Sequence, residues 1–389
     1  MSDFFSKYFL GDRVIWIIVV FLSIISILSV YSSIGDLAYK YAGGNTTFYL
    51  FRHLKFLIGG FILMYLIHRI PYNVFFSLSQ LLIVVAILLL IFTLVLGVTK
   101  NEATRWLTIP GLGFEFQTSD VAKFGLIVYI ARVLSMSQEN EDKLDKAFLK
   151  ILIPVGFVCA LILPSNFSTA VLLLLTSIVL MFIGRINTKK ILYLGAFLIV
   201  AFAFMFLLAK VMPSGRMGTW ANRIERFSND NTEDDYQANL AKVAIATSNI
   251  IGKGPGNSSV RYLLPQAYSD FIFAIIIEEW GSIMALFILA AYLILLYRTG
   301  MIVKKTSRTF AAFLAIGIIM LLVFQALTNI SVAVGIIPVT GQPLPLVSMG
   351  GTSLLITFSS LGIVLSISRS LSEEQPTSLE EEEEITVIS

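Results

Sequence analysis

The sequence has only one cysteine, only two histidines and few charged side chains among its 389 residues. Cys159 has no second cysteine with which to form a disulfide, so cysteine usage gives no indication of the compartment. His53 and His68 are too few to build a histidine-rich metal site between them. Charged residues make up 14% of the chain and hydrophobic residues 57%, which would leave a soluble domain with far too much apolar surface in water. The composition therefore predicts an integral membrane protein, and no nucleic-acid partner is expected.

Long apolar runs recur along the chain at the length of a membrane-spanning helix, which needs about 20 mostly apolar residues. By hydropathy we expect about ten such spans, and therefore an all-α polytopic membrane protein. The first run follows Lys7 and Arg13 without a small-residue cleavage site, which indicates a retained span and not a removed signal peptide. The expected spans are residues 14–33, 51–70, 74–98, 120–136, 147–163, 169–183, 191–212, 270–297, 310–333 and 352–370.

Lysine and arginine gather on one set of connections between these spans. By the positive-inside rule that side, together with both termini, is cytoplasmic, and an even number of spans agrees with two ends on one side. Residues 1–371 are expected to form one transmembrane domain, and the Glu-rich residues 372–389 a disordered cytoplasmic tail. The basic residues that set this orientation are Lys7, Arg13, Arg69, Arg132, Lys143, Lys146, Lys150, Arg185, Lys189, Lys190, Arg298, Lys304, Lys305 and Arg308.

Three segments on the opposite side are too long or too irregular to be plain connections. Residues 99–119 contain Arg105 and Trp106 in sequence, residues 213–269 form the longest polar stretch, and residues 336–351 are rich in Pro, Gly and Ser. Irregular backbone beside a bilayer is tolerated only where protein or a water-filled cavity covers it. We therefore expect the three segments to converge on a site at the outer face of the membrane.

Asp270 lies where the polar stretch 213–269 joins the apolar run 270–297. Ser269 or Asp270 would make a good helix N-cap, and the positive end of the helix dipole favours an ionised carboxylate there. The alternative hypothesis is that Asp270 acts as a base at the outer face. Capping is the commoner meaning of an isolated Ser-Asp pair before a helix, so the functional hypothesis depends on the surrounding segments.

Two pairs of ionisable residues inside predicted spans are further candidates, because such groups within a span often mark function. Asp120 and Lys123 are three apart, which places them on one helix face where an ion pair can form. That pair either neutralises itself for structural reasons or forms the polar floor of a cavity. Glu278 and Glu279 should lie roughly 12–14 Å deeper than Asp270, at 1.5 Å of rise per residue. We expect them to pair with a cation on another span, with Lys123 as the candidate, and Asp270 to act alone.

The long outer stretch is basic, with Arg223 and Arg226 three apart inside the amphipathic residues 220–227. An interfacial helix whose arginines reach lipid headgroups is the commoner explanation of such a pattern. The alternative is a clamp for a lipid-linked phosphate, because guanidinium groups match phosphate oxygens. The Gly-rich residues 252–256 lack the spacing of a nucleotide-binding loop and are a weak signal for one.

Several stretches in combination resemble the SEDS family of polytopic membrane proteins, the family of FtsW and RodA. Their order and spacing match the family across nearly the whole chain, ten spans included, and the combination is specific although no single piece is. The sequence departs from the family pattern at Thr118, where Pro is usual, at Asp120, where Glu is usual, and at Asn166, where the family has an acid. The matching stretches are residues 103–107, 116–123, 264–273, 278–281, 329–330, 338–345 and 348–353.

The resemblance implies a peptidoglycan glycosyltransferase that polymerises lipid II on the outer face of the cytoplasmic (inner) membrane, the face toward the periplasm. Asp270 matches the catalytic aspartate of the family and is expected to be the general base. The resemblance also implies a class B penicillin-binding transpeptidase and other divisome membrane proteins as partners. Residues 164–170 and 253–258 look more like the septal FtsW branch than the RodA branch, which acts in elongation.

No cofactor is implied with certainty, although a divalent cation (Mg²⁺ or Mn²⁺) would suit a pyrophosphate leaving group, and its ligands are unknown. Glu278 and Glu279 are expected to serve as charge-pair residues. The residues expected to contact substrate are Arg105, Trp106, Gln117, Asp120, Lys123, Arg223, Ser269, Gln342, Ser348, Gly350, Gly351 and Ser353.

Two other classes of function fit parts of the sequence. A lipid II flippase is the main alternative, since broken helices and charges within the membrane also suit transport. A transporter needs its site near the bilayer midplane with access from both sides, whereas Asp270 and the three irregular segments all lie on the outer side. A membrane scaffold that recruits partners through its loops and acidic tail does not explain so many polar residues at one face.

Overall fold

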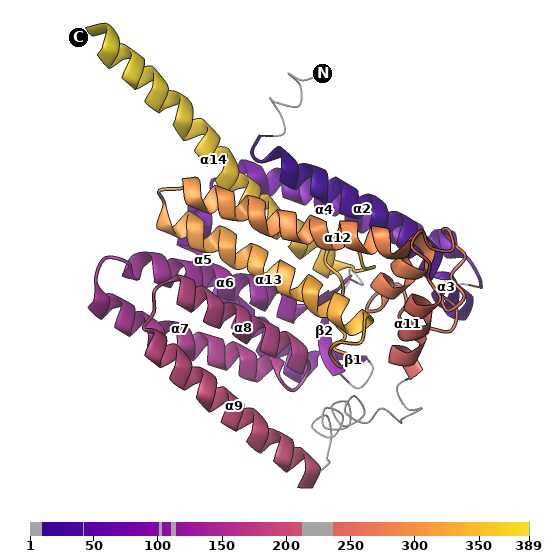
Figure 1. The fold of residues 1–389 in the computed structure, drawn as a ribbon. Helices are drawn as coiled ribbons and strands as arrows, with labels where there is room; N and C mark the ends of the chain where they lie inside the picture. The colour runs from indigo at the N-terminus through magenta and orange to yellow at the C-terminus, as the bar shows by residue number, and fades with distance from the viewer. Residues whose placement is uncertain (1–9, 42, 101–102, 110–113, 212–235, 389) are drawn as a thin grey trace.

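The computed structural model describes residues 10–41, 43–100, 103–109, 114–211 and 236–388. They form a bundle of long helices with a small antiparallel sheet near one end (Figure 1). The elements in chain order are α2 (Arg13–Ser33), α3 (Gly35–Tyr41), α4 (Thr46–Arg69), α5 (Asn73–Leu96), β1 (Val98–Lys100), β2 (Ala103–Ile109), β3 (Phe114–Gln117), α6 (Thr118–Ser137), α7 (Glu141–Ile162), α8 (Phe167–Ile183), α9 (Thr188–Val211), α11 (Tyr236–Ala246), α12 (Ile272–Lys305), α13 (Thr309–Ala333) and α14 (Thr352–Ile388).

Each of the ten predicted spans coincides with one of these helices, and only the short α3 and α11 lie outside them in the described chain. Seven helices are long and apolar enough to cross a membrane by length and composition: α2, α4, α5, α9, α12, α13 and the Thr352–Glu373 part of α14. Helix α8 is apolar but has 17 residues, and α6 and α7 carry acidic side chains in their first turns. The fold is an all-α polytopic membrane bundle.

Close packing inside the bundle contrasts with apolar faces on its outside. Helix α14 packs against α4, and a Cβ atom on Gly60 would overlap the buried ring of Phe358. Helices α4, α5 and α9 turn apolar side chains outward, and Ile62, Leu81 and Phe197 are each more than half exposed. Such faces would be costly in water and suit a hydrocarbon environment. Helix α9 lies at the edge of the bundle (Figure 1).

The segment 99–119, which the sequence predicts to be irregular, contains a three-stranded antiparallel sheet in the order β1–β2–β3. Trp106 of β2 pairs with Gln117 of β3, and Leu107 pairs with Phe116. Strand β3 leads directly into α6 at Thr118. A count of hydropathic spans does not detect strands as short as these, although their Thr, Trp and Phe content favours them. The sheet fixes the direction in which α6 enters the bundle.

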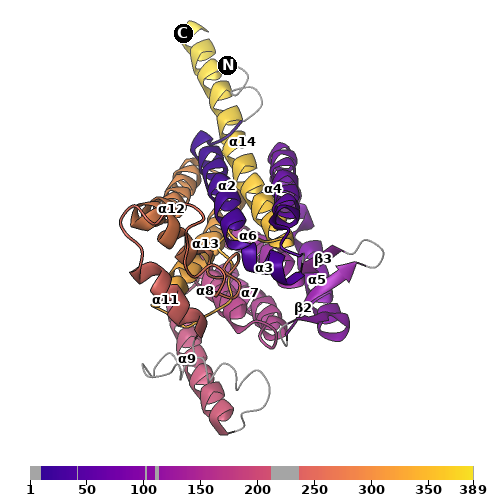
Figure 2. The ribbon, with the colours of Figure 1, turned by 90° about the vertical axis from the view of Figure 1, so that its right-hand side faces the viewer.

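The last helix extends past the predicted span 352–370. Helix α14 continues to Ile388 and projects beyond the bundle (Figure 1), over the residues for which the sequence predicts a disordered tail. Leucine and glutamate are good helix formers, and a helix that begins inside a packed bundle needs no new nucleus to extend. Figure 2 shows the opposite end of the bundle, where α3, α11 and the sheet gather.

Candidate active site

Asp270 lies in the turn that precedes α12, and its side chain is half-buried. The N-cap residue of α12 is Phe271 and no side chain caps this helix end, so the prediction that Ser269 or Asp270 caps the helix is wrong. The hydroxyl of Ser269 instead donates a hydrogen bond to Oδ1 of Asp270 at 3.0 Å. The amide of Ser269 bonds to the carbonyl of Gln266 at 2.9 Å, in a tight turn that directly precedes the helix.

The backbone around Asp270 is held by side chains from two distant segments. Asn329, near the end of α13, donates from Nδ2 to the carbonyl of Asp270 at 2.8 Å and to the carbonyl of Gln342 at 2.7 Å. Ser348 donates from Oγ to the carbonyl of Ser269 at 2.6 Å. Four segments of the chain therefore meet here: the turn before α12, the end of α13, and the two halves of the irregular stretch 336–351. We call Ser269, Asp270, Asn329, Gln342 and Ser348 the Asp270 junction.

Two further contacts tighten the Asp270 junction. Gln342 is buried and donates from Nε2 to Oγ1 of Thr169 at 2.8 Å, which ties the junction to the first turn of α8. Gly341 has a left-handed backbone (φ 67°), and a Cβ atom there would lie 3.5 Å from Oδ2 of Asp270. Glycine is therefore suited to this position both by its conformation and by the close approach of the carboxylate.

Asn166 occupies the position where the family usually has an acid. Its side-chain oxygen accepts a hydrogen bond from the amide of Thr169 at 3.2 Å, so it is the N-cap of α8. An asparagine oxygen caps a helix about as well as a carboxylate does. The substitution therefore keeps the start of α8, and with it Thr169, in place beside Gln342.

Asp120 and Lys123 form the predicted ion pair, with 2.8 Å between Nζ and Oδ1, and both side chains are buried. Nζ of Lys123 also donates to Oε1 of Gln325 at 3.2 Å, and Nε2 of Gln325 donates to the carbonyl of Pro343 at 3.0 Å. Oδ2 of Asp120 is buried without a described hydrogen-bond donor. The pair lines a narrow cavity of about 40 Å³ between α6, α13 and α14, which Ser353 also lines. Gln325 thus connects this cavity to the stretch that carries Gln342.

The remaining expected substrate residues are spread around the start of α14. Gln117 bonds through Nε2 to Oγ of Ser119 at 2.8 Å, and its amide donates to Oγ1 of Thr352 at 3.3 Å. Gly351 lies against the ring of Phe56 on α4, and a Cβ atom at Gly350 would meet Ser353 and Leu354 at ordinary contact distances. These contacts join the sheet to α14 and α14 to α4.

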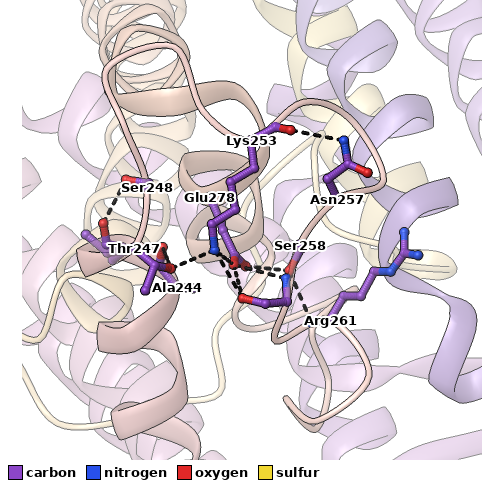
Figure 3. A network of polar contacts seen from close by, with 10 residues as sticks. Ala244, Thr247, Ser248, Lys253, Asn257, Ser258, Arg261 and Glu278 are labelled. Atoms are coloured by element: carbon purple, nitrogen blue, oxygen red, sulfur yellow. Dashed lines mark hydrogen bonds and ion pairs between the residues drawn. The ribbon is translucent and has the colours of Figure 1, made fainter.

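Glu278 pairs with Lys253 of the polar stretch 213–269 and not with Lys123, so the predicted partner is wrong (Figure 3). Nζ of Lys253 lies 2.6 Å from Oε1 of Glu278. The hydroxyls of Ser258 and Ser259 donate to the same carboxylate at 2.5 and 2.6 Å, and the amide of Ser259 donates at 3.0 Å. Glu278 is completely buried, so its charge is balanced by one cation and three further donors. We call these four residues the Glu278 clamp.

A break in the backbone of α12 brings Lys253 next to Glu278. Gly281 leaves the helical conformation (φ 79°, ψ 177°), which releases carbonyls of the preceding turn from their helical partners. The amide of Lys253 donates to the carbonyl of Glu278 and that of Gly254 to the carbonyl of Glu279, both at 2.9 Å. Gly252 is also left-handed (φ 85°), and a Cβ atom there would overlap the backbone of Glu279. The Gly-rich residues 252–256 are thus a docking surface for the kink.

Glu279, the neighbour of Glu278, is buried and accepts a hydrogen bond from the hydroxyl of Ser32 on α2. Two expected substrate residues lack a described position for their side chains. Arg105 lies on β2, where only the backbone is described, and Arg223 lies outside the described residues. Within the described residues no three His, Cys, Asp or Glu side chains come together as a metal site.

Sequence reasoning missed several residues that hold the site together. The sequence pattern indicated Asn329 only within the stretch 329–330 that resembles the family, and it indicated no role for Gln325, Thr169 or Gly341. Gln325 and Asn329 are four residues apart in the otherwise apolar helix α13 and are both buried. An amide recurring at helical spacing inside an apolar span was the signal that could have found them, because buried amides need partners.

The chain matches the family model described as "Cell cycle protein", that of FtsW, RodA and SpoVE, over residues 12–373. It is 30% identical over 366 residues to a probable peptidoglycan glycosyltransferase FtsW of Coxiella burnetii, covering 90% of this chain and 95% of that protein. It is 30% identical over 363 residues to Stage V sporulation protein E of Bacillus subtilis, covering 92% and 97%.

Among solved structures, the fold resembles a chain of a peptidoglycan synthase complex that coordinates polymerization and crosslinking. The TM-score is 0.75 at 23% sequence identity, over 93% of this chain and 98% of that chain. At this identity the likeness concerns the fold, and it agrees with the helical bundle described above. With a family match that spans all ten long helices, the chain belongs to the FtsW/RodA/SpoVE family of cell cycle proteins.

Proposed function

We propose that this chain is a peptidoglycan glycosyltransferase that polymerises lipid II into glycan strands, with Asp270 as the general base. The observation that carries the proposal is the Asp270 junction, which fixes the backbone of Asp270 through Asn329 and Ser348 while its carboxylate is only half-buried. A base must be held in place and reachable by the substrate at the same time. Relatives named as probable peptidoglycan glycosyltransferases support the reaction class.

The proposed reaction joins two sugars at the expense of the bond between the donor sugar and its pyrophosphate. A hydroxyl oxygen of the acceptor sugar forms a bond to the anomeric carbon of the donor, and the bond from that carbon to the pyrophosphate oxygen breaks. The hydroxyl proton passes to a carboxylate oxygen of Asp270. Because the hydroxyl loses its proton only as the new bond forms, a weak base such as an ionised aspartate is sufficient.

The departing pyrophosphate needs positive charge nearby. Lys123 is paired with Asp120, and Lys253 is bound in the Glu278 clamp, so neither is a fully available cation. Arg105 and Arg223 are the expected residues for this role. A divalent cation would be an alternative source of positive charge for the pyrophosphate, and we derive no step through one.

The proposed setting is the cytoplasmic (inner) membrane, with both termini in the cytoplasm and the Asp270 junction at the outer face. The distribution of lysine and arginine along the chain supports this orientation. A class B penicillin-binding transpeptidase is the proposed partner, together with other divisome membrane proteins. The similarity of fold to a chain of a peptidoglycan synthase complex supports such a partner. Relatives named FtsW favour a septal role over elongation, and a fluorescent fusion that localises along the side wall would contradict it.

A lipid II flippase is the competing function, and reconstitution separates the two. The purified chain, with its transpeptidase partner, is placed in vesicles that contain labelled lipid II. Polymer length is read by gel electrophoresis, and transbilayer movement by accessibility of the label from outside. We expect glycan strands to form from lipid II that is already on the accessible leaflet. Movement of the label without polymer would overturn the proposal.

A further inference from the structure

A cavity of about 420 Å³ lies at the end of the bundle from which α14 projects, far from the sheet and α11 (Figure 1). It is bounded by the first residues of α2, the last turns of α12 and the middle of α14. The side chains of Arg13, Arg298 and Lys305 line it, together with Met301, Ser368 and Leu371. None of these residues belongs to the Asp270 junction, to the Glu278 clamp or to the Asp120–Lys123 pair.

The one carboxylate in the wall of this cavity is fully engaged. Oδ1 of Asp12 accepts hydrogen bonds from the amides of Val14 and Ile15 at 2.9 and 3.2 Å, so it caps α2. Oδ2 of Asp12 accepts from Nε and Nη2 of Arg298 at 2.9 and 2.6 Å. Asp12 is buried and is neutralised by Arg298. It therefore does not compensate the two other basic side chains.

Arg13 and Lys305 are exposed, and neither has a carboxylate partner among the described residues. Three cations and one carboxylate give the cavity a formal charge of +2. Two uncompensated cations that face one cavity of this size, from two different helices, form a site for a compact anion. Phosphate is the anion whose several oxygens suit two separate basic side chains.

The apolar surroundings identify the source of that phosphate. On α2, Arg13 is followed at helical spacing by Ile17, Val20, Ile24 and Leu28, which are 43–66% exposed and form one apolar stripe. Met301 and Leu371 add apolar surface to the cavity itself. A ligand that places a phosphate between Arg13 and Lys305 and runs apolar chains along α2 has the chemistry of an anionic membrane lipid.

We propose that this cavity binds the phosphate headgroup of an anionic membrane lipid, held by Arg13 and Lys305, with an acyl chain along the exposed stripe of α2. The bound lipid contacts α2, α12 and α14 at once, so it links the helix that begins after the Asp270 junction to the first and last spans. The inference does not depend on the proposed polymerase reaction, and its failure would leave that reaction unaffected.

The test compares two double variants of the full chain with equal loss of charge. Arg13→Gln/Lys305→Gln removes both uncompensated cations of the cavity. Lys304→Gln/Arg308→Gln removes two exposed cations at the same end that do not line it. Binding of dioleoyl-phosphatidylglycerol to the delipidated protein in neutral detergent is measured by native mass spectrometry and by the shift in unfolding temperature. Each basic residue near a membrane surface contributes about 1 kcal/mol to binding anionic lipid, so we expect the cavity variant to bind about thirtyfold more weakly.

The control variant should bind phosphatidylglycerol with an affinity within about twofold of that of the unmodified chain. Dioleoyl-phosphatidylcholine should bind neither the control variant nor the unmodified chain. Equal losses in both double variants would show diffuse surface attraction and overturn the site. No loss in the cavity variant would overturn it as well. If inorganic phosphate at the same concentration stabilises the unmodified chain as much as the lipid does, the ligand is free phosphate, and the assignment to a lipid is wrong.

Discussion

Asp270 and Glu278 lie eight residues apart, Asp270 in the turn before α12 and Glu278 inside that helix, yet their carboxylates have different surroundings. Glu278 is completely buried and bound by Lys253, Ser258 and Ser259. Asp270 is half-buried; Ser269 donates a hydrogen bond to its carboxylate, and Asn329 donates one to its backbone carbonyl. The contacts of the Glu278 side chain stabilise the kink, whereas Asn329 fixes the backbone of Asp270 beside a carboxylate that is only half-buried. The difference separates a structural acid from a candidate catalytic one.

The buried pair Asp120–Lys123 should behave like Glu278 and give the largest loss of stability. Lys123→Met leaves the carboxylate of Asp120 buried without a counter-charge, which costs about 3–5 kcal/mol of unfolding free energy. The measurement is denaturant unfolding in detergent. The double variant Asp120→Asn/Lys123→Met removes both charges and should recover much of the loss. A single variant as stable as the unmodified chain would show that the pair is not structural.

Removal of the charge of Glu278 should be slightly less damaging, because Lys253 is 27% exposed and can regain water. We expect Glu278→Gln to lower the unfolding free energy by about 3 kcal/mol. Glu139→Gln is the matched control, since Glu139 forms an ion pair with Lys143 at the surface, where water screens the two charges and the pair contributes little to stability. Equal effects from the two variants would remove the distinction between the clamp and an ordinary surface pair.

Substitution of Gly252 tests whether residues 252–256 pack against the kink in α12. Gly252 and Gly43 both have left-handed backbones. A Cβ atom at Gly252 would overlap the backbone of Glu279 and Gly281, whereas a Cβ atom at Gly43 would have no described neighbouring atom within 4 Å. Gly252→Ala should therefore destabilise the protein by about 2 kcal/mol more than Gly43→Ala, because overpacking adds to the backbone strain. Similar unfolding temperatures for the two variants would contradict the docking.

The Asp270 junction should show the opposite balance, with a modest loss of stability and a larger loss of activity. Asn329→Ala removes two hydrogen bonds and should cost about 1–2 kcal/mol of unfolding free energy. Polymerisation at saturating lipid II should fall further, about tenfold or more, since the carboxylate of Asp270 is displaced from its productive position. Thr328→Val is the control, because the hydroxyl of Thr328 bonds only to the carbonyl of Phe324 in its own helix. Unchanged turnover in Asn329→Ala would separate the junction from catalysis.

The sequence predicted the long helices well because membrane spans are encoded by local runs of apolar residues. It also predicted the Asp120–Lys123 ion pair, which depends only on a spacing of three along one helix. The partner of Glu278 could not be predicted in that way. Lys253 lies 25 residues earlier, and its approach depends on the break at Gly281, which hydropathy does not show. The N-cap of α12 is Phe271, directly after a tight turn between Gln266 and Ser269, and the Ser-Asp pattern did not indicate that turn.

The convergence of Ser269, Gln342 and Ser348 was expected only in outline. Sequence patterning indicated that irregular segments beside a bilayer must be covered by protein, and the structure shows Asn329 and Gln325 as the side chains that bind them. Those contacts are long-range pairings between amides and backbone carbonyls. No local propensity encodes such pairings, so they come from the packing of α13 against the stretch 336–351.

The central claim is that the carboxylate of Asp270 takes the proton of the acceptor sugar. The most direct measurement is the rate of glycan formation by Asp270→Asn in vesicles with the partner present, alongside lipid II binding and unfolding temperature. The account predicts that binding and unfolding change little while the rate falls by about 100-fold or more, the usual contribution of a general base. Glycan strands formed by Asp270→Asn at the rate of the unmodified chain would contradict the account.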